Sequence, residues 1–420
     1  MSRLSAWYDR HRGGRTIVIG WLVTRAVTLL ILATKAERFM VGDVYYYHSK
    51  LRALFDVGLG QTLNEYPTPV VWILLLPYGA TGGSRVGYLV AFMIFMLLLD
   101  AVFTYALYRS GGRRHDLAVD FWLLFVFLIG ALCYLRFDML PAVLAGGALL
   151  TARRTPWVTG ALIGLGAAIK LWPALLIPSF LSYRPDRKPA GLAFLGVGVG
   201  LALISLVTGG WSRLISPLTW QSDRGLQIES VWATPLMAAR AIRPASWIVD
   251  KSKYQAYEIV GPGVPGWLVV SNVATVAGLL VIAALVVRAF RAGGSTPMAV
   301  GFLVVATVAI MIMTNKTFSP QYLLWLGASA ALLLHGLGAS PDELRAIRRI
   351  AAQLLLLALL NHLVYPLLYD GLLGRDGRAM IVVSTLVTTL RNIALVAFTV
   401  EVCRMAWRFL GAGHPVEVDE

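Results

Sequence analysis

The stretch "TIVIGWLVTRAVTLLILATKA" at residues 16–36 is an almost unbroken apolar run, and "FMVGDVYYYHSK" follows it at residues 39–50. A transmembrane helix needs roughly 20 apolar residues, because backbone groups without hydrogen bonds are costly in hydrocarbon. The first run therefore predicts a helix across the bilayer. It is too long for a signal-peptide core and lacks a small-residue cleavage site, so we expect it to be retained.

The composition extends this prediction to the whole chain. Of the 420 residues, 58% are hydrophobic and 14% are charged, and the mean hydropathy is +0.70. A soluble domain of this size cannot bury so much apolar surface. We predict an all-α polytopic integral membrane protein in one domain over residues 1–420, with about twelve transmembrane helices, some of them short or broken by proline.

The net charge of +15 indicates topology rather than a nucleic-acid partner, because the basic residues are dispersed. Alternating the predicted spans places every basic cluster on one side of the membrane. That side is predicted to be cytoplasmic, with both termini on it. The clusters lie at residues 3–15, 109–114, 153–154, 184–188, 288–291, 345–349 and 404–408.

Four polar segments fall on the opposite, outer side. The first, 36–85, contains a predicted amphipathic helix from Asp43 and then "NEYPTPVVWILLLPYGATGG", which is too short to span comfortably and is expected to lie at the interface or to re-enter the membrane. The longest is 211–263, and the others are 315–321 and 369–378. The polar segments of the protein are thus predicted to face outward, and the apolar helices are predicted to lie in the bilayer.

Asp43 follows Gly42 at the predicted start of the amphipathic helix. A carboxylate there can cap the helix by accepting free N–H groups, and it can equally serve as a catalytic group. The helical repeat puts Asp43, Tyr46 and Tyr47 on one side, which is expected to face a lumen. The two roles do not exclude each other.

Two short joints between predicted spans carry charge. Arg136 and Asp138 in "LRFDMLP" have a plain interpretation as a salt bridge with each other at a helix turn. Lys170 in "AIKLWP" is expected either to extend to the outer surface or to lie beside a cavity at a helix end that proline breaks. Charged residues at such depth usually mark a substrate path.

The later outer segments repeat the combination of charge and aromatic residues. Arg224, Gln227 and Glu229 share a loop with two tryptophans, which suits either a sugar ring or an interface anchor. His362 in "LNHLVYP" is more often a packed histidine than a base. The segment "NKTFSPQYLLWL" contributes Lys316, Gln321 and Tyr322.

Other charges are predicted to be structural. Arg25 lies within a span and is expected to pair with Asp100 or Asp120, because a buried charge needs a partner. Cys133 and Cys403 fall near opposite faces of the membrane, so no disulfide is predicted between them. No spacing of residues indicates a metal site, and no cofactor is predicted.

The sequence also limits the kind of donor that an enzyme of this class could use. It contains no glycine-rich phosphate loop, and the inner connections are too short for a nucleotide-binding fold. A soluble nucleotide donor is therefore not expected. The remaining energy-rich substrate for an outward-facing membrane enzyme is a lipid that carries an activated group.

Five stretches in order resemble glycosyltransferase family 87: "GDVYYY" at 42–47, "EYPTPVVWILLLP" at 65–77, "FDMLPAVLAGGALL" at 137–150, "GALIGLGAAIKLWPALLIP" at 160–178 and "FSPQYLLWL" at 318–326. The resemblance covers roughly residues 15–340. It implies a GT-C fold and an actinobacterial transferase that uses polyprenyl-phosphate sugars. The family includes α-1,2-mannosyltransferases acting on phosphatidylinositol mannosides, lipomannan and lipoarabinomannan, while related enzymes transfer arabinofuranose.

By this resemblance Asp43 matches the family's first-loop aspartate, which makes it the expected general base. We expect a plasma-membrane mannosyltransferase with its active site on the outer face, a polyprenyl-phosphate-mannose donor and a glycolipid acceptor. The alternatives are an arabinofuranosyltransferase that uses decaprenyl-phosphate-arabinose, and a lipid-linked-sugar flippase, for which polar groups on both faces and inverted repeats would be expected. The candidate donor-phosphate ligands are Lys170, Arg136, Arg224 and Lys316, and the remaining candidate binding residues are Gln321, Tyr322, Glu65, Asp138, Glu229, His362, Tyr46 and Tyr47.

Overall fold

A computed structural model describes residues 14–34, 37, 39–111, 115–183, 187–292, 295–335 and 341–410. Its first half consists of helices joined by short connections. In chain order these are α2 (Gly14–Leu32), η1 (Phe39–Val41), α4 (Gly42–Val57), η2 (Leu59–Gln61), α5 (Thr68–Ala80), α6 (Arg85–Ser110), α7 (His115–Ile129), η4 (Gly130–Tyr134), α8 (Met139–Thr151), α9 (Pro156–Ile169), η5 (Trp172–Leu176), α10 (Ile177–Leu181) and α11 (Arg187–Ser222).

The second half adds one antiparallel hairpin, in which Ile248 pairs with Val260 and Asp250 with Glu258. Its elements are η7 (Val231–Ala233), α12 (Thr234–Ile242), η8 (Pro244–Ser246), β1 (Ile248–Lys251), β2 (Tyr257–Val260), α13 (Val264–Arg291), α14 (Pro297–Thr314), η9 (Pro320–Leu323), α15 (Leu324–Leu333), α16 (Pro341–His362), the π-helical turn η10 (Leu363–Leu367), α17 (Tyr369–Leu373) and α18 (Arg378–Phe409).

The all-α membrane architecture is confirmed. Within the described residues, 8 helices are long and apolar enough to cross a bilayer, and 4 shorter apolar helices accompany them, at Thr68–Ala80, Met139–Thr151, Pro156–Ile169 and Trp172–Leu181. The helices of spanning length are thus fewer than the expected number of about twelve crossings, and the short ones do not reach the roughly 20 residues that a single crossing needs. α14 and α15 form the centre, where most side chains are buried.

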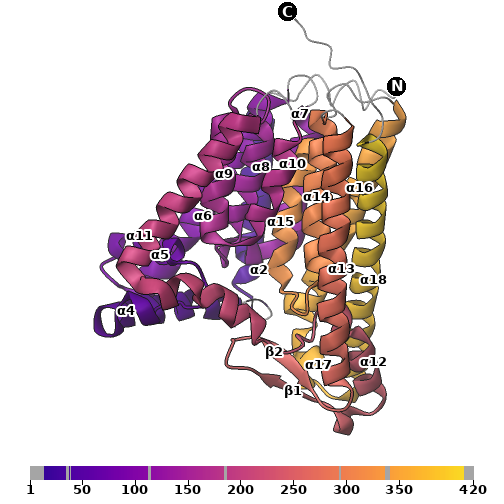
Figure 1. The fold of residues 1–420 in the computed structure, drawn as a ribbon. Helices are drawn as coiled ribbons and strands as arrows, with labels where there is room; N and C mark the ends of the chain where they lie inside the picture. Colours follow the sequence, from indigo (N-terminus) through magenta and orange to yellow (C-terminus); the bar gives the residue numbers. More distant parts are fainter. Residues whose placement is uncertain are drawn as a thin grey trace, which may run out of the picture.

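The two ends of the described chain lie at the same end of the molecule (Figure 1). Gly14 lies beside Tyr108 near the end of α6, and Phe409 stacks on Phe302 near the start of α14 with ring centroids 4.6 Å apart. The described parts of the predicted basic clusters, at the end of α6, between α8 and α9, at the end of α13 and at the end of α18, lie at this end too (Figure 1). α4, α5, α12, α17 and the β-hairpin gather at the opposite end, called the outer end below (Figure 1).

α11 bends sharply where it reaches the outer end. Gly210 adopts φ 78° and ψ 174°, a conformation that a residue with a Cβ rarely adopts. The chain after the bend runs across the outer end toward the hairpin (Figure 1). The polar segment expected from residue 211 therefore begins directly after this bend at Gly210.

α9 approaches α11 closely, as the glycines in "GALIGLGAAI" allow. A Cβ on Gly160 would lie only 1.9 Å from the carbonyl oxygen of Ala190, and one on Gly164 would lie 3.0 Å from that of Phe194. The first contact is impossible without a shift of the backbone, and the second is tighter than most Cβ contacts, so the small residues set the distance between the two helices.

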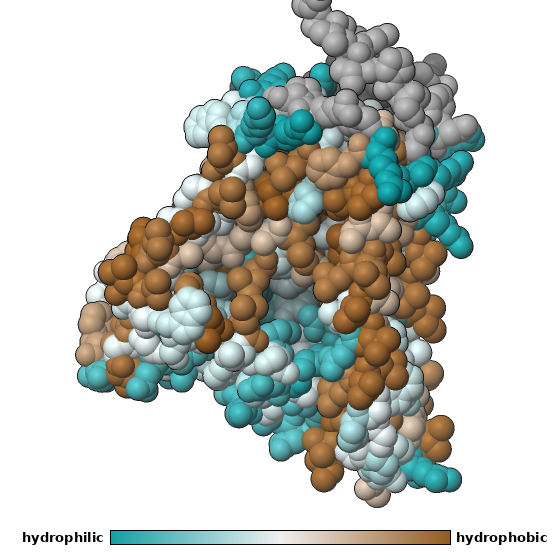
Figure 2. Space-filling view, viewed as in Figure 1, coloured by the Kyte–Doolittle hydropathy of each residue, from teal (hydrophilic) through white to brown (hydrophobic). Residues whose placement is uncertain are grey.

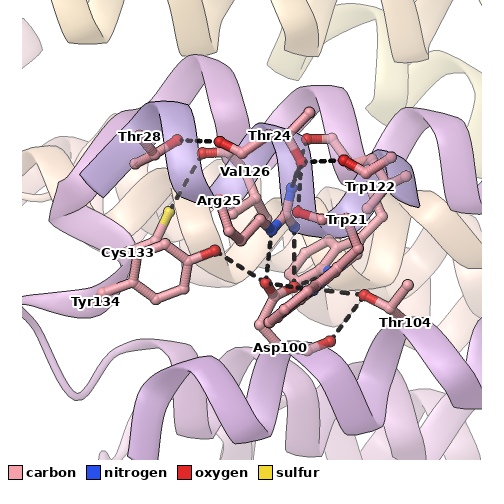
Figure 3. A network of polar contacts seen from close by, with 12 residues as sticks. Trp21, Thr24, Arg25, Thr28, Asp100, Thr104, Trp122, Val126, Cys133 and Tyr134 are labelled. Carbon is pink, nitrogen blue, oxygen red and sulfur yellow. Dashed lines mark hydrogen bonds and ion pairs between the residues drawn. The ribbon is translucent and has the colours of Figure 1, made fainter. Parts of the chain in front are cut away.

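The buried ion pair expected for Arg25 forms with Asp100 (Figure 3). Arg25 donates from Nε to Oδ2 at 2.8 Å and from Nη2 to Oδ1 at 3.0 Å. Asp100 also accepts hydrogen bonds from Trp21 at 2.9 Å, Trp122 at 2.8 Å and Tyr134 at 2.9 Å. This network joins α2, α6, α7 and η4 inside the membrane region. Cys133 and Cys403 are free, as predicted.

Candidate active site

Asp43 lies in the first turn of α4 at the outer end, but it does not cap the helix. The capping position belongs to Val41, which makes no side-chain hydrogen bond. Asp43 instead forms an ion pair with Arg136, with 2.6 Å between Oδ2 and Nη2, and its side chain is 50% exposed. The capping interpretation was wrong because a buried guanidinium, rather than the helix N–H groups, binds the carboxylate.

Arg136 and Asp138 do not pair with each other, contrary to the plain interpretation of "LRFDMLP". Arg136 is buried and also donates to the carbonyl oxygens of Met40 at 3.3 Å and Leu135 at 2.9 Å, and to the hydroxyl of Tyr365 at 3.3 Å. Asp138 pairs with Lys170. The joint between η4 and α8 thus contacts two distant segments: Arg136 binds the start of α4, and Asp138 binds the end of α9.

Lys170 does not extend to the surface. It ends α9 in an extended conformation, and its side chain, 15% exposed, turns inward to Asp138. Its ammonium lies 5.1 Å from the ring centroid of Phe137, 5.3 Å from that of Tyr322 and 5.0 Å from that of Trp325. Aromatic faces stabilise a cation that is partly removed from water.

Tyr46 and Tyr47 do not share one lumenal side as predicted. Tyr47 is buried, and it contacts Phe137 and Tyr66 with ring centroids 5.9 Å and 6.3 Å away. Tyr46 donates its hydroxyl to Glu65 at 2.8 Å. Burial, reinforced by Glu65, raises the pKa of the Tyr46 hydroxyl well above its usual range. These contacts place Glu65 beside the start of α4.

Several residues of this cluster were not singled out from the sequence. Trp325 donates its indole N–H to Asp138 at 2.8 Å and stacks on Tyr322 with centroids 4.1 Å apart. Trp172 also stacks on Trp325, with ring centroids 5.0 Å apart. The signal was present in "KLWP" and "QYLLWL", where an aromatic residue follows close after each polar candidate. Gln321 precedes Tyr322 in η9 and is half-buried.

Arg224 and Lys316 lie near the hairpin and contact neutral oxygens. Arg224 donates to the carbonyl of Tyr254 at 3.3 Å and to the side chain of Gln221 at 3.5 Å. Lys316 donates to the carbonyl of Ser222 at 2.7 Å. Partial burial lowers the pKa of the Lys316 ammonium. Neither cation forms an ion pair with a carboxylate in the described part of the chain, in contrast to Arg136 and Lys170.

Glu229 has a structural role rather than a place in an open site. It is fully buried and pairs with Arg391, whose Nη1 lies 2.8 Å from Oε2 and whose Nη2 donates to the Glu229 carbonyl at 2.6 Å. Burial raises the pKa of its carboxyl. Gln227 is also buried, with its backbone N–H donating to the carbonyl of Lys316 at 3.1 Å. The ion pair joins this loop to α18.

His362 lies in a packed environment, as expected for an isolated histidine. Its Nε2 is 3.0 Å from Oε1 of the buried Glu37, and its Nδ1 is 3.2 Å from the carbonyl of Ile129. Gly130 has φ +79°, and a Cβ on it would lie 2.5 Å from the imidazole. The histidine therefore joins α16 to the segment after α2 and to the end of α7.

Figure 2 shows a hollow between the two groups of helices that diverge toward the outer end. α5 and α11 lie on one side of it, and α13 with the β-hairpin lies on the other (Figures 1 and 2). Hydrophilic residues gather along its outer edge, while hydrophobic residues flank it toward the membrane region (Figure 2).

The arrangement offers a half-exposed carboxylate beside buried cations and stacked aromatic rings. Such a carboxylate can accept a proton, cations can stabilise a departing anion, and aromatic faces can contact a sugar ring. Within the described ranges, no group of three or more histidine, cysteine or acidic side chains is placed to hold a metal ion.

The chain is similar to one family of known proteins. The model of glycosyltransferase family 87 matches residues 66–315. The matched segment includes Arg136, Asp138, Lys170 and Arg224, whereas Asp43 precedes it. No curated protein matches the chain at a significant level. Because the family match spans more than half of the 420 residues and fits the polytopic helical fold, the chain belongs to glycosyltransferase family 87 and is a transferase of the GT-C type.

Proposed function

We propose that this glycosyltransferase moves mannose from polyprenyl-phosphate-mannose to a hydroxyl of a glycolipid acceptor such as a phosphatidylinositol mannoside, lipomannan or lipoarabinomannan. The reaction takes place at the outer end of the molecule, on the outer face of the plasma membrane, with the basic end and both termini in the cytoplasm. The donor's lipid tail lies toward the apolar flank of the hollow, and its sugar phosphate lies toward the polar edge.

The observation that carries this proposal is the state of the Asp43 carboxylate. One of its oxygens is bound to Arg136 at 2.6 Å, and the side chain is still 50% exposed. Its second oxygen accepts no hydrogen bond from the described residues, so it is available to an incoming hydroxyl. Arg136 is buried and has further partners, so it fixes the orientation of the carboxylate.

The transfer reaction needs a base for the acceptor hydroxyl, whereas the lipid phosphate is already a good leaving group and needs no strong general acid. Asp43 takes the proton of the acceptor hydroxyl as that oxygen bonds to the anomeric carbon of the donor sugar. The bond between the anomeric carbon and the phosphate oxygen breaks, and the lipid phosphate leaves with the electron pair. A single displacement inverts the configuration, so a β-linked donor gives an α-linked product. No covalent intermediate with the protein forms.

The donor phosphate requires cations that are not already neutralised by carboxylates. Arg224 and Lys316 meet this requirement better than Arg136 and Lys170, because their described bonds go to neutral oxygens. Lys170, held by Asp138 within the aromatic rings, is better suited to shape the sugar side of the site. The cations at the hairpin therefore receive the phosphate.

Replacement of either hairpin cation is expected to weaken donor binding more than it slows the chemical step. A hydrogen bond to a charged group contributes about 1.5–3 kcal/mol, so Arg224→Gln and Lys316→Gln should each raise the KM for the donor about 10- to 100-fold. Steady-state kinetics at varied donor concentration measures this change. Lys253→Gln, which removes an exposed charge from the same region, is the matched control. An unchanged KM in both site variants would contradict the phosphate assignment.

The donor itself is identified by offering two substrates separately to the purified protein with a phosphatidylinositol mannoside acceptor. Polyprenyl-phosphate-mannose should be consumed and a product heavier by one hexose should appear in the mass spectrum. Consumption of decaprenyl-phosphate-arabinose alone would replace mannose with arabinofuranose in this proposal. Turnover of neither donor with any glycolipid acceptor would overturn the assignment of a lipid-phosphate donor.

A further inference from the structure

A groove of about 650 Å³ lies far from the outer end, near the last turns of α18. It is bounded by α13, α16 and α18. Its apolar lining includes Val281, Leu285 and Met405, and its polar lining includes Arg349, Glu401, Arg404 and Arg408. No part of the proposed transfer reaction uses these residues.

The polar part of the groove is positively charged. Arg349 pairs with Glu401 at 3.0 Å, which neutralises one arginine. Arg404 and Arg408 are exposed and form no ion pair with the described residues. The lining therefore keeps a net charge of two arginines, which favours an anionic ligand. Figure 2 shows the hydrophilic residues of this end directly above the hydrophobic band of the helices.

The apolar part of the groove faces the region that lipid occupies. Val281 on α13 is 45% exposed, and most of the side chains around it on the same helix are apolar and exposed. Trp407 borders the groove with 49% of its surface exposed, and the guanidinium of Arg288 lies 4.3 Å from its ring centroid. Tryptophan and arginine together are typical of the level of lipid headgroups.

We infer that this groove binds one anionic glycerophospholipid of the leaflet at the basic end of the molecule. Its phosphate lies against Arg404 and Arg408, and one acyl chain lies along Val281, Leu285 and Met405. The charge of the polar lining selects an anionic head over a zwitterionic one, and the apolar lining selects a lipid over a free anion. The bound lipid contacts both α13 and α18, which line the groove together.

The test compares the parent protein with the double variant R404Q/R408Q in detergent. Native mass spectrometry after addition of phosphatidylglycerol should show one tightly bound lipid on the parent. Each arginine near a lipid surface changes the affinity about fivefold, so the double variant should bind phosphatidylglycerol about 25-fold more weakly. Phosphatidylcholine should bind to both proteins equally weakly.

Three further experiments distinguish lipid binding in the groove from general attraction to a basic surface, from anion binding and from dimer formation. R153Q/R154Q removes two exposed arginines from another loop of the same end and should keep the parent affinity; an equal loss there would show general attraction to a basic surface. Val281→Trp fills the acyl groove without changing charge and should also weaken binding. If inorganic phosphate competes for the groove as well as the lipid does, the lipid assignment is wrong. The assignment is also wrong if the parent protein forms a dimer instead of a lipid adduct and R404Q/R408Q abolishes that dimer.

Discussion

Asp43→Asn is expected to lower kcat for sugar transfer about 10²- to 10⁴-fold, the range typical of a lost general base. Asparagine fills the same space but cannot take the proton of the acceptor hydroxyl. The donor KM should change little, because the carboxylate does not contact the donor phosphate in the proposed mechanism. Transfer by the purified variant, followed by mass spectrometry of the product, measures the effect.

Asp56→Asn is the matched control, because Asp56 is an exposed aspartate on the same helix, α4. It should transfer sugar at the parent rate. The Asp43 variant also leaves Arg136 without its carboxylate, so its thermal unfolding must be compared with that of the parent. A folded Asp43→Asn protein with the parent kcat would show that Asp43 is not the base.

Asp100→Asn is expected to lower the free energy of unfolding by about 3 kcal/mol or more. The change leaves the guanidinium of Arg25 buried without its carboxylate, at 2% exposure. It also replaces a carboxylate that accepts six hydrogen bonds with an amide whose oxygen can accept only part of them. The midpoint of denaturant unfolding in detergent measures the loss.

Asp376→Asn, at an exposed position of the outer end, should leave the midpoint unchanged. The double variant Arg25→Met with Asp100→Leu removes both charges, and it should recover part of the loss, because well-packed apolar residues often replace a buried ion pair at small cost. If the double variant is no more stable than Asp100→Asn, the loss comes from packing or from the donors of Trp21, Trp122 and Tyr134 left without an acceptor, rather than from the unpaired charge.

The sequence predicted the fold well because lipid imposes simple rules. The length of the first run gave α2, and the proline-bracketed stretch from Asn64 gave the short α5, as its bounds at Thr68 and Ala80 show. The partner of Arg25 was narrowed to Asp100 or Asp120, since few carboxylates lie within spans and a buried charge needs one, and the fold selects Asp100.

The pairing within the candidate site was less predictable. Arg136 and Asp138 are two residues apart, but they bind Asp43 and Lys170, which lie on separate helices. Proximity in sequence favours the local pair, whereas the fold brings better-oriented partners from a distance. The partner of Glu229 was unpredictable for a related reason: a polar loop on a hydropathy profile gives no sign that Arg391 will reach it.

The contact between Gly160 and Ala190 has a consequence for how mutational screens of this enzyme are interpreted. Gly160 lies ten positions before Lys170, which is about 15 Å along an α-helix that ends at Lys170. A methyl group at Gly160 would push α9 away from α11, and a rigid helix carries that displacement to its far end. A screen scored by turnover alone would then rank a remote glycine among the reactive groups, although it touches no substrate. Separate measurements of folding and of the transfer rate distinguish a variant at Gly160, which displaces Lys170, from a variant that removes the Lys170 side chain.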